Sequence, residues 1–354
     1  MEPIPAAPPA TTGALAVEPS ARRAFRRMVG AAVVLVLALI MLGAWVRLTD
    51  AGLGCPDWPG CYGKLTPAQA RAQIAQAVQQ QGGEHGPVSM GKAWREMVHR
   101  YVAIGLGLLI VAIAAVAWRR RVELRQSPLL AVSLVGVVVL QGLFGKWTVT
   151  LLLEPAIVTG HLLGGMLTFA LLLWLWLRQQ PPTRYLDAEP VAALRVPALF
   201  ALAMVAFQIF LGGWTSTNYA ALACTDFPTC QGQWWPPADF RDGFHFVRDL
   251  GMTGDGQLLA TQALTAIHLV HRLGAVVVLA VVAWLGIRTI RSEGERRLGV
   301  AILAMLSLQW ALGLANVWLS LPIAVAVAHN GGAALLLGLL VMLNFRAFRA
   351  RLQI

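Results

Sequence analysis

A pattern of histidines occurs twice in this chain. His99 recurs 172 residues later as His271, and His161 recurs 168 residues later as His329. All four lie in apolar stretches, where an ionisable side chain is costly and commonly marks function. Two imidazoles from each of two equivalent units can bind one metal ion per unit from opposite sides. The sequence therefore predicts two bis-histidine metal centres.

The two predicted centres differ in one neighbouring side chain. Glu96 precedes His99 by three residues, and the matching residue before His271 is His268. On a helix, residues three apart share a face. A carboxyl in apolar surroundings tends to act in proton transfer, so we expect a catalytic site in the first copy and an electron-transfer site in the second. The competing interpretation is an interfacial carboxylate paired with Lys92, Arg95 or Arg100.

Haem is the metal group that best suits these centres. Two imidazoles at matched depth on facing helices can coordinate a flat porphyrin from both faces. Small residues follow each second histidine and would admit the macrocycle, or equally allow close helix packing: Gly164, Gly165, Gly331 and Gly332. Arg100 and Arg272 each follow a first histidine. We expect them to pair with haem propionates, although long cationic side chains also reach toward the membrane surface.

The composition is that of a membrane protein. The chain has 354 residues, of which 57% are hydrophobic and 13% charged, against about a quarter charged in soluble domains. Apolar runs long enough to cross the hydrocarbon core as helices predict an all-α integral membrane fold with eight spans. They are expected at about 29–46, 97–118, 128–147, 156–177, 196–214, 264–287, 298–318 and 323–345.

The net charge of +11 reflects membrane orientation. Arginines cluster before the first span and after every even-numbered one, so the positive-inside rule places both termini and these loops in the cytoplasm. A nucleic-acid partner is therefore not expected. The arginines and apolar run at the start also resemble a signal peptide. We interpret the run as a retained helix because it leads directly into the repeat without a small-residue cleavage site.

The duplication extends to the first external loop of each unit. Residues 45–63 (WVRLTDAGLGCPDWPGCYG) align with residues 214–232 (WTSTNYAALACTDFPTCQG) at a constant offset of 169. Four spans separate the copies, so we predict two tandem four-helix bundles in parallel orientation. The predicted units are a disordered tail at 1–28, a first half at 29–178, a linker at 179–195, a second half at 196–345 and a tail at 346–354.

All four cysteines lie in these loops, on the side opposite the arginines. The pairs Cys55–Cys61 and Cys224–Cys230 share the spacing C-x5-C. Each pair can form a plain disulfide in an oxidising compartment, or a dithiol that acts in redox or cofactor transfer. One pair supplies only two ligands, which argues against zinc.

Other polar residues receive simpler interpretations. His85 and His245 lie in external loops and are expected at the surface, and residues 65–85 are expected to form an amphipathic external helix. Arg47 and Asp50 leave the first span as a local pair. Glutamines and one asparagine within the spans are expected to make interhelical hydrogen bonds: Gln141, Gln208, Gln309 and Asn316.

With these motifs in view, the chain resembles the haem A synthase family of respiratory membranes. The resemblance covers about residues 29–345. It rests on EMVHR with Glu96 and His99, GH with His161, HR with His271, AHNGG with His329 and the loop RLTDAGLGCPDWPGCYGKLTP at 47–67.

The resemblance implies a chemistry and a division of labour. Members oxidise the C8 methyl of haem O to a formyl group by successive hydroxylations, giving haem A for terminal oxidases. The residues matching His271 and His329 would hold haem B in the second half. Those matching His99 and His161 would receive the substrate haem, with Glu96 in catalysis. Cys55–Cys61 would have a functional role, and Cys224–Cys230 a structural one.

Further expectations follow from the same resemblance. They are a bacterial inner-membrane location with external cysteine loops, and partners that include haem O, its farnesyltransferase, oxidase assembly factors, membrane lipid and further copies of the chain. One rival is a di-haem b-type cytochrome that only transfers electrons. Another is a transporter, which the scarcity of broken helices and midplane charges disfavours.

Overall fold

The computed structural model describes residues 20–83, 86–181, 188–292 and 294–351. Within this part of the chain, eight helices are long and apolar enough to cross a membrane. They are α1 (Ser20–Leu48), α3 (Met90–Arg119), α5 (Leu129–Thr150), α6 (Pro155–Leu177), α8 (Arg195–Thr217), α10 (Thr261–Ile290), α11 (Arg296–Trp318) and α12 (Ile323–Arg351). The prediction of an all-α fold with eight spans is confirmed.

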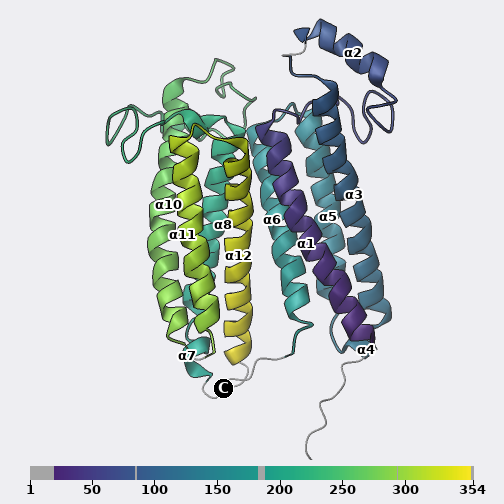
Figure 1. Ribbon diagram of the computed structural model, residues 1–354, viewed down its shortest axis with the longest axis vertical. Coiled ribbons are helices and arrows are strands. Elements are labelled where there is room, and N and C mark those ends of the chain that lie inside the picture. Colours follow the sequence, from purple (N-terminus) through teal and green to yellow (C-terminus); the bar gives the residue numbers. More distant parts are fainter. Residues whose placement is uncertain (1–19, 84–85, 182–187, 293, 352–354) are drawn as a thin grey trace, which may run out of the picture.

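The long helices stand side by side in two groups (Figure 1). In one, α1 packs against α3 and α6, and α5 packs against α3 and α6; in the other, α8, α10, α11 and α12 are connected in the same cyclic way. The groups meet where α6 and α12 contact each other, with α1 against α12 and α6 against α8. This arrangement agrees with the predicted repeat, while the boundaries of the halves stay a prediction.

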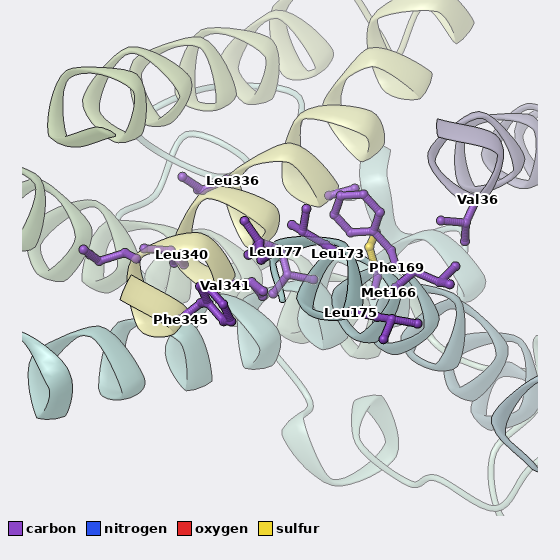
Figure 2. Close-up of a cluster of buried hydrophobic side chains, with 14 of the residues drawn as sticks. Val36, Met166, Phe169, Leu173, Leu175, Leu177, Leu336, Leu340, Val341 and Phe345 are labelled. Atoms are coloured by element: carbon purple, nitrogen blue, oxygen red, sulfur yellow. The ribbon is translucent and has the colours of Figure 1, made fainter. Parts of the chain in front are cut away.

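The contact between the two groups is apolar. Figure 2 shows Phe169 and Leu173 of α6 beside Leu336 and Leu340 of α12, with Val36 of α1 at one side. Gly338 of α12 lies under the Phe169 ring, and a Cβ at that glycine would lie 3.1 Å from the ring. Close contact through small residues is typical of membrane helices.

Apolar side chains also face outward from the bundle. Leu108 is 67% exposed, and Val139 is 59% exposed, both within spans. In the most apolar window of α12, 44% of the residues are buried, against 11% for α5. A membrane protein satisfies such outward apolar surface with lipid, so these values place α12 at the centre and α5 at the periphery.

Several helices extend beyond the predicted spans. Helix α1 begins at Ser20, so residues 20–28, assigned above to a disordered tail, are helical; residues 1–19 lie outside the described part. Helix α12 likewise continues to Arg351, into the predicted tail. Hydropathy detects only the apolar segment, whereas backbone hydrogen bonding continues the helix past the hydrocarbon boundary.

Short helices lie in the connections. They are α2 (Arg71–Gln80), α4 (Arg121–Leu124), α7 (Glu189–Ala192), η2 (Ala220–Leu222) and α9 (Phe240–Gly243). Helix α2 is the predicted amphipathic external helix and is shorter than expected over the described residues 65–83; residues 84 and 85 lie outside the described part. It buries Ile74 and Ala77 against the loop that carries Cys55 and Cys61. It therefore covers the first cysteine loop.

Candidate haem sites

The four recurring histidines come from four helices and lie in two pairs. His99 of α3 lies within electrostatic reach of His161 of α6. His271 of α10 lies within the same kind of reach of His329 of α12. Each pair therefore belongs to one group of helices. The structure thus brings together the residues that the sequence analysis paired, although whether they bind iron stays a prediction.

Each imidazole packs against a glycine on the neighbouring helix. A Cβ at Gly43 would lie 3.1 Å from Cε1 of His99, and one at Gly212 would lie 3.1 Å from Cε1 of His271. The corresponding distances are 3.5 Å for Gly145 and His161, and 3.3 Å for Gly313 and His329. The glycines leave room for the rings on all four helices.

The histidines are suited to holding a metal group. Nδ1 of His99, His161 and His329 is buried with no hydrogen-bond partner. Burying an unpartnered polar atom costs free energy, and coordination of these rings to a metal would offset that cost. The described residues contain no group of three or more histidine, cysteine, aspartate or glutamate side chains placed to hold a metal ion by themselves. A metal held here therefore needs ligands besides protein, such as the four nitrogens of a porphyrin.

Glu96 lies in a buried network with the first cysteine loop. Its Oε2 accepts a hydrogen bond of 2.9 Å from the backbone N–H of Cys55, and its Oε1 pairs with the guanidinium of Arg100. Glu96 is only 4% exposed. The interpretation of Glu96 as a partner of Arg100 thus describes its contacts correctly. That pairing leaves a catalytic role open, because the carboxylate still lies one helical turn from His99.

Arg100 connects helix α3 to the loop above it. Besides Glu96, it donates to the backbone oxygens of Asp57 at 2.8 Å and Gly60 at 2.6 Å. In the second half, Arg272 donates to the backbone oxygens of Thr229 and Cys224. Both arginines therefore hold their own cysteine loops. Propionate pairing stays a prediction, and any propionate would share these donors with the loop.

His268 occupies the place of Glu96 in the second half. Nε of Arg272 lies 3.2 Å from its Nε2. The ring is buried at 4% exposure, and its Nδ1 has no partner. The first half thus presents a carboxylate beside its histidine pair, and the second half presents a third imidazole. This is the asymmetry that the sequence predicted.

The cysteines form the two disulfides Cys55–Cys61 and Cys224–Cys230, and no free cysteine is present among the described residues. Each loop turns around an aspartate. Asp57 accepts from the backbone N–H of Gly63 at 2.8 Å. Asp226 accepts from the backbone N–H of Gly232 at 3.0 Å. The hydroxyl of Thr229 and these backbone donors lower the pKa of Asp226 to about 2.

Two of the predicted interhelical hydrogen bonds are confirmed, and they involve the histidines. The amide of Gln208 on α8 donates to the backbone oxygen of His271 at 2.9 Å. The amide of Gln309 on α11 donates to that of His329 at 2.9 Å. The spacing of these glutamines predicts helix packing, and it does not indicate that their partners are the candidate ligands. Arg47 and Asp50 form the expected local pair, at 3.5 Å.

The fold and the site define a class: an eight-helix membrane protein whose two halves each bury a histidine pair suited to haem. A family model described as "Cytochrome oxidase assembly protein" (COX15-CtaA) matches residues 26–341. The chain belongs to this family.

Relatives from several bacteria cover most of the chain. It is 41% identical over 312 residues to the heme A synthase of Shewanella oneidensis, and the aligned region covers 88% of this chain and 93% of the relative. It is 29% identical over 347 residues to the heme A synthase of Sinorhizobium medicae, with 92% and 90% covered. For that of Allorhizobium ampelinum, the identity is 28% over 348 residues, with 90% and 89% covered.

Proposed function

We propose that this protein is a haem A synthase, an oxidoreductase that converts haem O to haem A. The observation that carries the proposal is the unequal pair of sites: His99 and His161 with Glu96 in one half, and His271 and His329 with His268 in the other. Relatives that bear the name heme A synthase and match nearly the whole chain support it.

In this proposal the second half holds a resident haem B. His271 and His329 lie on facing helices, and glycines at positions 212 and 313 leave room for their rings. The iron of a bound haem supplies stepwise electron transfer. The protein supplies the two imidazoles, an apolar bundle that excludes water, and Arg272 at the loop.

The first half receives haem O as substrate, near His99 and His161. Haem O carries a farnesyl chain, so it reaches the site from the bilayer and needs no aqueous path. The methyl group is oxidised first to an alcohol and then to a hydrated aldehyde, which loses water to leave the formyl group. Each oxidation adds one oxygen atom to the methyl carbon and removes two electrons from it. With water as the oxygen source, each step would release two protons and pass the two electrons to an external acceptor.

Glu96 is the residue that we expect to manage those protons. It is buried, it lies one helical turn from His99, and Arg100 and the N–H of Cys55 hold its two oxygens. A positioned carboxylate contributes to catalysis by taking or giving a proton at a defined place. The loop and α2 above it shield this carboxylate from solvent.

The proposed setting is a bacterial inner membrane. Both termini would lie in the cytoplasm and the cysteine loops outside, as the arginine distribution indicates. The farnesyltransferase that makes haem O, oxidase assembly factors and further copies of the chain are the proposed partners. Direct transfer from the farnesyltransferase would keep an insoluble haem out of water.

The test is the haem content of protein purified after co-expression with a haem O-producing farnesyltransferase. Extraction and mass-resolved chromatography should find haem B together with haem O, its hydroxylated form or haem A. Haem B alone, at two per chain, would instead identify an electron-transfer cytochrome and exclude the synthase.

A further inference from the structure

Each candidate ligand faces a short motif on the neighbouring helix. On that neighbouring helix, the residue four positions before the glycine beside the ring lies on the same helix face as the glycine. In three helices that residue is glutamine: Gln141 before Gly145, Gln208 before Gly212 and Gln309 before Gly313. In α1 it is Leu39, before Gly43. The motif Q-x-x-x-G thus faces three of the four histidines, and L-x-x-x-G faces His99.

Each of the three glutamine side chains packs against a second glycine, which lies three residues after the histidine that the glutamine faces. A Cβ at Gly274 would overlap Oε1 of Gln208, and one at Gly332 would overlap Oε1 of Gln309. A Cβ at Gly164, after His161, would likewise overlap the amide of Gln141, here through Nε2. The residue three after His99 is Val102. The first-half site therefore lacks both parts of this socket, the amide and the glycine, at one of its two histidines.

Hydrogen-bond contacts from glutamine to the histidines are found in the second half. Nε2 of Gln208 lies 3.0 Å from Nδ1 of His271 and 2.9 Å from its backbone oxygen. Nε2 of Gln309 lies 3.4 Å from Nε2 of His329, the other ring nitrogen, and 2.9 Å from its backbone oxygen. Nδ1 of His329 is without a partner, as is Nδ1 of His99 and His161 in the first half. What distinguishes the second half is the glutamine amide beside a ring nitrogen of both His271 and His329.

An amide against a ring nitrogen restricts the imidazole. It offers a donor and an acceptor, so it can match either tautomer of the ring. The accompanying bond to the backbone oxygen ties the amide to the same residue. Partners of this kind orient metal-binding histidines, and their loss typically lowers metal affinity by about 10–100-fold.

We infer that Gln208 and Gln309 are positioning residues that make the second half a permanent haem site, and that Leu39 and Val102 leave the first half able to exchange its haem. This inference rests on the proposed function and explains a requirement of it. A synthase must keep its cofactor through many turnovers, whereas it must release each product. The two halves share a fold, and these positions separate the two behaviours.

The first experiment measures the rate at which purified protein loses haem B to an excess of a haem-scavenging apo-globin. We expect Gln208→Leu and Gln309→Leu to lose haem B at least about 10-fold faster than the wild type, with a shifted reduction potential. Leucine is the residue that the first half carries at the position of Gln208. The control is Gln262→Leu, whose side chain is exposed in the first turn of α10, and it should leave both readouts unchanged.

The second experiment introduces the glutamine and the second glycine into the first half, beside His99. The double variant Leu39→Gln/Val102→Gly should retain haem O or haem A through purification and lose it at least about 10-fold more slowly than the wild type. Slower haem loss in this variant would test the inference even if Gln208→Leu or Gln309→Leu failed to fold.

The outcomes separate the two proposals. Wild-type loss rates and potentials in folded Gln208→Leu and Gln309→Leu would overturn the role of the glutamines, as would unchanged retention in the double variant. A wild-type protein without haem B, or full haem B in His271→Ala, would instead defeat the proposed function itself.

Discussion

The hydroxyl of Tyr219 donates a hydrogen bond of 2.8 Å to Oδ1 of Asp50, and these two residues occupy equivalent positions in the two halves. Arg47 and Ser216 are equivalent as well, and Arg47 donates to the backbone oxygen of Ser216 at 2.7 Å. The guanidinium also lies 3.9 Å from the centre of the Tyr219 ring. The end of α1 in the first half therefore contacts the equivalent end of α8 in the second half.

We expect Arg47→Met to weaken the contact between the halves. The substitution keeps the apolar stem but removes the donors to the carbonyls of Ser216 and Thr217. Hydrogen bonds from a charged group of this kind contribute about 1.5–3 kcal/mol each. Thermal unfolding in detergent should show a lower midpoint. An unchanged midpoint would mean that the hydrogen bonds of Arg47 do not help to hold the halves together.

Glu96→Gln should abolish haem A formation while leaving haem B bound. The amide keeps the size of the side chain and can accept from Cys55, but it cannot take a proton. We expect a fall of at least about 100-fold, the lower range for loss of a general acid–base group. The ratio of haem A to haem O in extracts measures it. Full haem A formation would remove Glu96 from the mechanism.

His271→Ala and His99→Ala should separate the two sites. The first variant should lack haem B, because only one of the two proposed ligands, His329, remains. The second should keep haem B and fail to convert haem O. Haem analysis of both proteins, with folding checked by size-exclusion chromatography, tests the assignment. Loss of haem B from His99→Ala alone would reverse the roles of the halves.

The two disulfides offer a matched comparison. Both close loops with a sequence separation of 6, so replacing either pair by serine should cost a similar free energy, about 2–3 kcal/mol. Of the two disulfides, only the first contains a residue that donates to Glu96, through the backbone N–H of Cys55. We therefore expect Cys55→Ser/Cys61→Ser to lower haem A formation well below that of Cys224→Ser/Cys230→Ser at equal stability. Equal activities would make the first pair purely structural.

Asp226 should make the second loop sensitive to strong acid. Its pKa is lowered to about 2 in the folded protein, so its charged form stabilises the loop above its ordinary pKa near 4. This contribution is lost as the pH falls through about 2. The difference in unfolding midpoint between wild type and Asp226→Asn should be constant above about pH 4 and shrink below it. A difference independent of pH would indicate that the charge is irrelevant.

The sequence by itself determined the spans, the repeat and the identity of the four histidines. Hydropathy is a local property, and equivalent residues such as His161 and His329 are visible through spacing alone. The asymmetry of Glu96 and His268 was readable for the same reason. Q-x-x-x-G was also present as a spacing, but its meaning depends on a histidine about 20 to 63 residues away.

Only the tertiary structure decided which side chains meet across helices. Arg100 and Arg272 could reach either a haem or their loops, and the loop carbonyls are where their donors lie. The contact of Arg47 with Ser216 depends on how two similar halves pack, which no single repeat contains. A side chain's partner is set by helix rotation and crossing, and hydropathy along one helix does not specify these quantities.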